Sequence, residues 1–265
     1  MGLMSSDIAC ECTIEKCDIF DFMAKYVGLS VLHPGGFVAT EILANQCKIN
    51  KQMRILDIAC GKGTSALFFA RKYGCRVEGI DISEELINEA DKFASQERLK
   101  DIVNFRVGDA LNLPYADNEF DATVAQAMLI LVSDKRKVIR EARRVVKPGG
   151  YSGWLELSWK KPTPKEFIDA VSNEICAFCM TNVLTYENWE SLFREAGFSQ
   201  IEVIKSSIAM NGLKGMIQDE GFGNIIKVMS KYMFNKKVRN RMKNLNRFIN
   251  ANQQYFGYGI YIAKK

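Results

Sequence analysis

The chain has 265 residues, of which 48% are hydrophobic and 25% charged, a composition typical of a globular protein with one sizeable core. It contains no run of about 18 uncharged apolar residues, which excludes a membrane-spanning helix. The first residues lack the basic-then-apolar pattern of a secretory signal, so we expect a cytoplasmic protein.

The distribution of charge and of cysteines further limits the classes of protein to which the chain could belong. Residues 221–265 contain ten Lys and Arg and no Asp or Glu, whereas residues 1–220 contain 26 Lys and Arg against 31 Asp and Glu. The overall charge of +5 therefore comes from a basic C-terminal part. Eight scattered cysteines without an export signal indicate reduced thiols, and Cys176 and Cys179 form a CxxC without a second pair. With a single histidine, the sequence predicts no metal site.

In chain order, the first 160 residues alternate between helical and strand patterns. Helices are expected at 7–30, 37–47, 65–73, 84–96 and 134–146, and strands at 54–60, 76–83, 103–110, 120–129 and 151–159. Ser83 is an N-cap candidate, and "KPGG" at 147–150 should stop the fifth helix. This alternation predicts a parallel sheet covered on both faces.

The second part of the chain is more helical. Residues 162–180 and 185–198 favour helices, and 200–207 and 258–264 favour strands, with a mostly helical insertion at 210–256 between those strands. Without an internal repeat or linker, we expect a single domain over 1–265. In this domain 1–50 would be a helical lid, 51–160 a cofactor-binding core, and 161–265 the substrate side.

A glycine turn follows the first strand, in "ILDIACGKG". Gly61 and Gly63 allow a tight turn and bring a ligand close to the backbone N–H groups that open the next helix. With Asp81 farther along, "GKGTSA" also fits a dinucleotide site, so an NAD-binding oxidoreductase is an alternative. Asp57 at the mouth of this turn would repel a pyrophosphate but suits a ligand with an ammonium and a sulfonium. Asp109, at the end of the third strand, could accept from an adenine amino group.

The segments "ILDIACGKG", "GIDIS", "GDALNLPYADNEFDATVAQ" and "RVVKPGG" together resemble the class I methyltransferases that use S-adenosylmethionine (SAM), in particular the type 11/25 small-molecule enzymes. The resemblance covers about residues 53–156. It implies an α/β fold, with a doubly wound, seven-stranded, mostly parallel sheet whose last strand is antiparallel. The N-terminal helices and the helical insertion before the last strand would be additions to it.

The resemblance also implies which residues bind SAM. Asp57, Ala59, Gly61 and Gly63 would line its methionine part, Asp81 would accept from the ribose hydroxyls, Ile82 would contact the adenine, Asp109 and Ala110 would meet the adenine edge, and Gln126 would face the methionine end.

Methyl transfer from a sulfonium is an in-line displacement, and it needs a general base only when the acceptor is protonated. His33 is the one histidine available as a base, although a turn histidine bonded to backbone is the alternative. Glu156, on the fifth strand, could face the acceptor. "AQAM" after the fourth strand is not the Asn/Asp-Pro-Pro-Tyr of base-amino methyltransferases, so DNA is not expected as a substrate.

The acceptor is therefore expected to be a small or lipid-like molecule, methylated at O, N or C. An arsenite methyltransferase using Cys176 and Cys179 is a further alternative. The basic segment 227–247 fits either peripheral contact with an anionic membrane or a solvated helix packed through Val228, Met229 and Met233.

Overall fold

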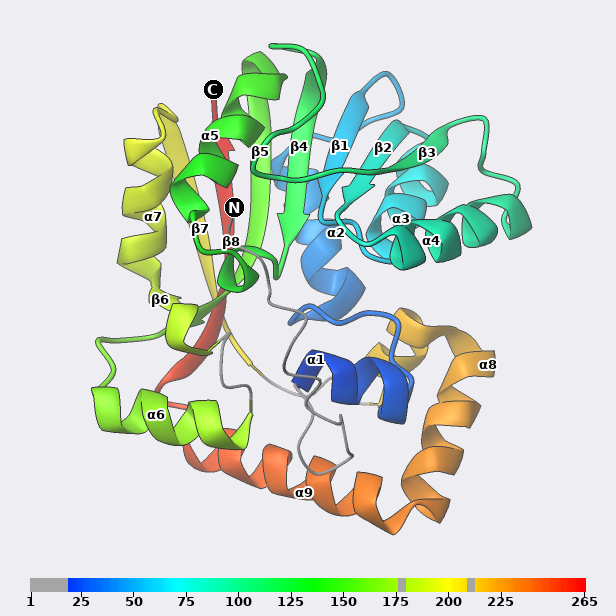
Figure 1. Ribbon diagram of the computed structural model, residues 1–265, viewed down its shortest axis with the longest axis vertical. Coiled ribbons are helices and arrows are strands. Elements are labelled where there is room, and N and C mark those ends of the chain that lie inside the picture. Colours follow the sequence, from blue (N-terminus) through cyan, green and yellow to red (C-terminus); the bar gives the residue numbers. More distant parts are fainter. Residues whose placement is uncertain (1–18, 176–179, 209–212) are drawn as a thin grey trace. The chain divides into compact units, whose positions relative to one another are not determined.

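The computed structural model describes residues 19–175, 180–208 and 213–265. The chain forms two compact units (Figure 1). The sheet unit comprises His33–Pro162, Asn182–Ala209 and Gln253–Lys265, and the helical unit comprises the rest. The single domain expected over residues 1–265 stays a prediction.

The sheet unit contains one mixed sheet. Its strands are β1 (Arg54–Ile58), β2 (Arg76–Asp81), β3 (Val103–Val107), β4 (Phe120–Gln126), β5 (Val146–Trp159), β6 (Leu184–Thr185), β7 (Gln200–Ser207) and β8 (Phe256–Lys264). The order is β3-β2-β1-β4-β5-β8-β7, and β6 pairs with the end of β5. Strands β1 to β5 are parallel, while β8 is antiparallel to both of its neighbours. The predicted doubly wound, mostly parallel sheet with an antiparallel last strand is confirmed, and the short β6 adds an eighth strand to the seven expected.

Helices cover both faces of this sheet. They are α2 (Gly36–Gln46), α3 (Thr64–Tyr73), α4 (Glu84–Gln96), α5 (Lys135–Val145) and α7 (Tyr186–Glu195). Leu43 of α2, Phe69 of α3 and Ala94 of α4 share one apolar core with strand residues such as Ile55. On β5, Leu155 belongs to this core, whereas the preceding residue, Trp154, packs against Phe193 of α7 with ring centroids 5.5 Å apart. Because strand side chains alternate between the two faces, β5 is apolar on both.

The N-terminal lid expected over residues 1–50 is divided in the structure. Helix α2, which lies in this range, packs into the core of the sheet unit through Leu43 and Ala44, both fully buried. The buried positions of α2 recur at helical spacing and form the face that packs on the sheet: Gly36, Phe37, Ala39, Thr40, Leu43 and Ala44. Residues 36–46 therefore belong to the core of the sheet.

Two local boundaries depend on turn chemistry. Ser83 caps α4, because its side chain accepts a hydrogen bond from the backbone N–H of Leu86 at 3.3 Å. Helix α5 ends at Val145, as expected, but β5 already begins at Val146 and passes through "KPGG". The register with β4 shifts there, where Phe120 pairs with Val146 and Ala122 with Tyr151. The irregular start of β5 was not predicted, since Pro and Gly normally end regular pairing.

The helical unit contains α1 (Ile19–Asp21), which continues as a π-helical turn over Phe22–Val27, and then α6 (Lys165–Glu174), α8 (Leu213–Phe234) and α9 (Lys236–Ala251). The mostly helical insertion is thus confirmed, with a kink at Gly221, where φ is 72°. Asn224 of α8 donates to the Gly28 carbonyl at 2.9 Å. Within the ranges that the structure describes, no helix is long and apolar enough to cross a membrane.

Candidate functional site

The glycine turn after β1 is built from left-handed backbone. Ala59, Gly61 and Gly63 have φ values of 57°, 54° and 75°. A side chain at Gly63 would place its Cβ 2.4 Å from Cζ of Phe105, so only glycine fits there. At Gly61, by contrast, no described atom lies within 4 Å of the Cβ position. The turn is therefore closely packed against Phe105 at Gly63, whereas at Gly61 it leaves room for a ligand.

Asp81 ties this turn to the end of β2. Its Oδ2 accepts from the N–H of Gly61 at 2.9 Å, and its Oδ1 accepts from the N–H of Ser83 at 3.0 Å. Each carboxylate oxygen makes one such bond and keeps a lone pair for a further donor. Ile82, directly beside it, is 74% exposed despite being apolar. An acceptor pair next to an exposed apolar side chain suits a ribose bearing an adenine.

Asp57 lies at the end of β1 and is almost completely buried. One of its oxygens, Oδ2, has no hydrogen-bond partner among the described residues, although the N–H of Ala66 donates to the carboxylate. Burial raises the pKa of Asp57 to about 8, and the nearby charge of Asp81 adds to this effect. A buried, unpaired carboxylate oxygen is costly unless a cation or donor meets it, which fits an ammonium group.

Asp109 and Ala110 follow β3. Oδ1 of Asp109 accepts from the N–H of Leu111 at 2.8 Å, and the side chain is exposed. In the parallel register Asp81 pairs with Val107, two residues before Asp109. The three predicted carboxylates thus lie at or near the carboxyl ends of three adjacent strands, which is where open α/β sheets bind ligands.

Gln126 ends β4 and is held from two sides. Its Oε1 accepts from the hydroxyl of Thr40 at 2.8 Å, and its Nε2 donates to Oγ of Ser65 at 2.8 Å. Sequence reasoning missed Thr40 and Ser65. For Thr40 a signal existed, because it lies on the apolar stripe of α2 between Phe37 and Leu43, where a polar residue is unusual. For Ser65 the sequence offers no such signal.

The two proposed catalytic residues are both in restrained positions. His33 is partly buried, with Nε2 3.3 Å from Oγ1 of Thr40 and Nδ1 3.5 Å from the Pro34 carbonyl oxygen. Burial lowers the pKa of His33 to about 4, so the ring is neutral near pH 7.

Glu156 is fully buried, and its Oε1 accepts from the N–H groups of Met128 at 3.1 Å and Leu129 at 2.9 Å. Burial raises the pKa of Glu156 to about 8. Its bonds hold the start of the 3-10 helix Leu129–Leu131 after β4. A catalytic role of either residue stays a prediction.

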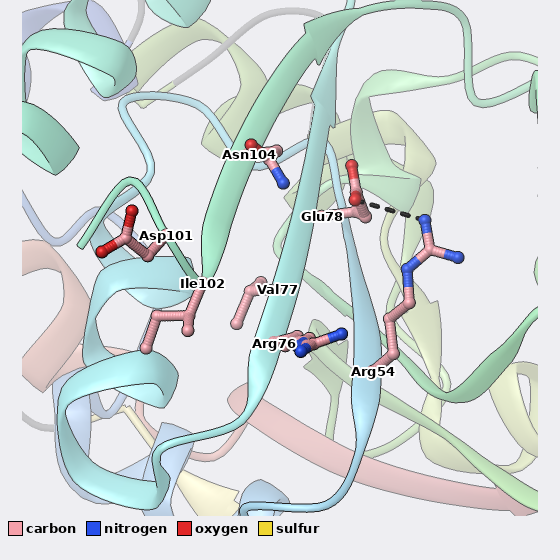
Figure 2. A pocket seen from close by; sticks show the side chains of 7 residues that line it. All are labelled: Arg54, Arg76, Val77, Glu78, Asp101, Ile102 and Asn104. Carbon is pink, nitrogen blue, oxygen red and sulfur yellow. Dashed lines mark hydrogen bonds and ion pairs between the residues drawn. The ribbon is translucent and has the colours of Figure 1, made fainter.

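A separate hollow of about 180 Å³ lies at the opposite edge of the sheet (Figure 2). It is lined by Arg54, Arg76, Val77, Glu78, Asp101, Ile102 and Asn104, residues at or near the starts of β1, β2 and β3. Arg54 pairs there with Glu78 at 3.2 Å. Because it lies at the amino ends of the strands, this hollow is distinct from the predicted cofactor site.

The cysteines that the structure describes give no support to arsenite chemistry. Cys47, Cys60 and Cys75 are buried, and burial raises the pKa of each thiol, that of Cys75 to about 11. Cys176 and Cys179 lie outside the described residues. Among the residues described, His, Cys, Asp and Glu form no group that could hold a metal ion.

Comparison with known proteins gives a consistent result. Residues 55–150 match the family described as "Methyltransferase domain". The chain is 29% identical over 229 residues to an uncharacterised protein of Haemophilus influenzae, covering 86% of each chain. It is 32% identical to methyltransferase GfsG of Streptomyces halstedii, covering 62% of this chain and 59% of the relative. To norajmaline N-methyltransferase of Rauvolfia serpentina it is 32% identical, covering 52% and 51%.

Solved structures share the fold. Phosphoethanolamine N-methyltransferase 2 of Haemonchus contortus, in complex with SAM, has a TM-score of 0.69 and 19% identity, covering 94% of this chain and 60% of that one. Geranyl diphosphate C-methyltransferase of Streptomyces coelicolor has a TM-score of 0.63 and 17% identity, covering 86% and 78%. Residues 55–150 thus match a methyltransferase domain, and the sheet order and the glycine turn agree with the fold of the class I, SAM-dependent methyltransferases.

The cofactor of this class is SAM, and the residues present fit it. The unpaired oxygen of Asp57 suits its ammonium group, and the two lone pairs of Asp81 suit its ribose hydroxyls. The NAD alternative gains no support, because the buried carboxylate of Asp57 would face a diphosphate.

Proposed function

We propose that this protein transfers a methyl group from SAM to a small organic or lipid-like acceptor. The observation that carries the proposal is the buried Asp57 carboxylate with an unpaired oxygen, next to the glycine turn and Asp81. The cofactor supplies a methyl group on a positively charged sulfur. The residues of the sheet unit hold that cofactor and fix the direction in which the methyl group points.

The acceptor atom is not fixed by the family. Relatives and neighbours are named as N-methyltransferases, O-methyltransferases and C-methyltransferases. In the sheet unit, both ring nitrogens of His33 lie near other groups, and Glu156 bonds to backbone. We therefore propose that these two residues position neighbouring groups, and that catalysis depends mainly on alignment of acceptor and methyl group.

Calorimetry with S-adenosylhomocysteine tests the cofactor proposal directly. We expect binding in the micromolar range by the wild-type protein and a large loss in Asp81→Ala, which lacks the ribose acceptors. Release of S-adenosylhomocysteine from SAM can then be measured across amines, phenols, phosphobases and prenyl diphosphates. Wild-type protein that binds neither SAM nor its product would overturn the proposal.

We also propose that the helical unit contacts an anionic lipid surface through α8. Phe222, Ile226, Met229 and Met233 recur at helical spacing and are 72%, 56%, 41% and 57% exposed. Only Val228 of the three residues expected to pack is buried. The segment around this stripe carries Lys and Arg without any Asp or Glu from 221 onward, which favours anionic lipid.

Vesicle sedimentation tests the membrane proposal. We expect the protein to sediment with vesicles containing phosphatidylserine and much less with pure phosphatidylcholine. Ile226→Ser with Met233→Ser should reduce this binding, because both changes remove apolar surface without altering charge. Equal sedimentation of the double variant and the wild-type protein would contradict the proposal.

A further inference from the structure

Four polar side chains form a continuous hydrogen-bonded series in the sheet unit, at the carboxyl end of β4. His33 Nε2 lies 3.3 Å from Oγ1 of Thr40, Thr40 donates to Oε1 of Gln126 at 2.8 Å, and Gln126 Nε2 donates to Oγ of Ser65 at 2.8 Å. Thr40 is fully buried on the inner face of α2. The series joins the helix before β1 to the helix that opens at the glycine turn.

The hydroxyl of Thr40 holds one end of the Gln126 amide, because it donates to Oε1 at 2.8 Å. A hydroxyl has one proton to give, and that of Thr40 lies nearest to Oε1 of Gln126, with the Gly36 carbonyl more distant at 3.4 Å. Nε2 of His33 is also more distant from the Thr40 hydroxyl, at 3.3 Å, so the shorter contact with Oε1 takes the Thr40 proton. Oε1 is then fixed toward α2 and the NH₂ group toward α3.

A fixed amide has directed groups left for a ligand. One N–H of Gln126 and one lone pair of Oε1 remain after the bonds to Ser65 and Thr40. Gln126 follows Ala125, which pairs with Ile58, so its backbone lies beside Ala59 at the start of the glycine turn. A carboxamide that rotated freely would have to be ordered when the ligand binds, and this ordering would reduce the free energy of binding.

We propose that Thr40 is a positioning residue, which holds the Gln126 carboxamide in the orientation needed to contact the methionine end of the cofactor. The inference rests on the proposed cofactor site and assigns the orientation of one of its groups to a residue outside it. His33 lies at the end of the series, with Nε2 3.3 Å from Oγ1 of Thr40.

The test measures the dissociation constant for S-adenosylhomocysteine by calorimetry. Thr40→Val keeps the shape and removes the donor, so we expect binding about three- to tenfold weaker, the range for one net hydrogen bond. Thr40→Ser restores the donor and should bind within about twofold of wild type. Thr123→Val is the matched control, because Thr123 is also fully buried and its hydroxyl pairs with that of Ser152 at 2.6 Å and not with Gln126.

A double-variant comparison separates positioning from general stability. If Thr40 acts through Gln126, Thr40→Val should weaken binding no further in a Gln126→Ala background. Equal binding by Thr40→Val and Thr123→Val, or additive losses in the double variant, would overturn the inference. Absence of binding by the wild-type protein would instead refute the cofactor site itself.

A second variant keeps the test usable if Thr40→Val does not fold. Ser65→Ala removes the other anchor of the amide at a partly exposed helical position, where alanine is tolerated. We expect a similar loss of binding and again no further loss with Gln126→Ala. Unchanged binding by Ser65→Ala would also contradict a fixed amide.

Discussion

Asp57 shows how a single buried carboxylate links fold and ligand. It lies at the end of an apolar strand, where desolvation raises its pKa to about 8 and leaves Oδ2 without a partner among the residues described. At the proposed cofactor site, the ammonium group of the cofactor would remove that penalty. Relief of this unfavourable environment of the Asp57 side chain would then contribute to the free energy of cofactor binding.

This leads to a pH dependence of cofactor binding. Below its raised pKa, Asp57 must lose a proton before it can pair with the ammonium of S-adenosylhomocysteine. We expect the dissociation constant to fall as the pH rises from about 6 to 7.5, by up to about tenfold per unit for one released proton. In Asp57→Asn the binding should be weaker and this dependence should be absent. Calorimetry over that range checks both, and a flat wild-type profile would contradict the assignment.

Glu156 gives a second prediction at the residue scale. An acid whose folded pKa is raised contributes stability that is present below its unfolded value, near 4, and lost progressively as the pH rises to about 8. Glu156→Gln keeps an oxygen for the N–H groups of Met128 and Leu129 without a charge. We therefore expect the variant to gain stability over wild type as the pH rises from about 5 to 8.

Glu156→Ala is the contrasting variant. It leaves the two backbone N–H groups without their acceptor, so we expect a loss of about 2–4 kcal/mol in urea denaturation. A stable Glu156→Gln protein that binds S-adenosylhomocysteine normally would fit the positioning role proposed above. Strong destabilisation by Glu156→Gln would show that the carboxylate itself is required.

At the scale of elements, the two glycines of the turn between β1 and α3 are expected to differ in role, one in packing and the other in ligand binding. Gly63 faces Phe105 and Ala90 from within the fold, whereas Gly61 faces open space. The two glycines have similar left-handed backbones, so the same substitution should have different consequences at each.

We expect Gly63→Ala to destabilise the protein by about 2–4 kcal/mol, from overpacking against Phe105 and an unfavourable φ. Gly61→Ala should cost only about 1 kcal/mol of stability but weaken S-adenosylhomocysteine binding, because its methyl group projects toward the ligand. Gly149→Ala, at φ 78° with no described atom within 4 Å, controls for backbone strain alone. Equal stability losses at all three positions would contradict this account.

At the scale of the whole molecule, the structure predicts where a ligand acts. A ligand present at 100 times its dissociation constant stabilises a protein by about 2.7 kcal/mol. For a unit of this size that corresponds to a rise in Tm of about 5–10 °C. We expect S-adenosylhomocysteine to produce such a rise, and hydrogen exchange to slow at the glycine turn and the ends of β2 to β4. Protection confined to α8 and α9 would contradict the assigned site.

Much of this protein follows from its sequence alone. Apolar runs that alternate with amphipathic segments are buried when the runs form a sheet and the amphipathic helices cover both of its faces. The order of strands and helices was therefore predictable through Trp159. The placement of Asp57, Gly61 and Asp81 near one another was predictable too, because the carboxyl ends of parallel strands meet at one edge of the sheet. The two-residue β6 and the early start of β5 were not, since neither leaves a periodic pattern.

Tertiary structure alone decided how the predicted residues are held. The bond from Gly61 to Asp81 spans 20 residues, and the bond from Thr40 to Gln126 spans 86. Local sequence patterns do not predict such hydrogen bonds, because the bonds depend on which strands become neighbours in the sheet. The same is true of charge: a sequence shows that Asp57 is acidic, but only its burial beside Asp81 raises its pKa and leaves Oδ2 without a partner among the described residues.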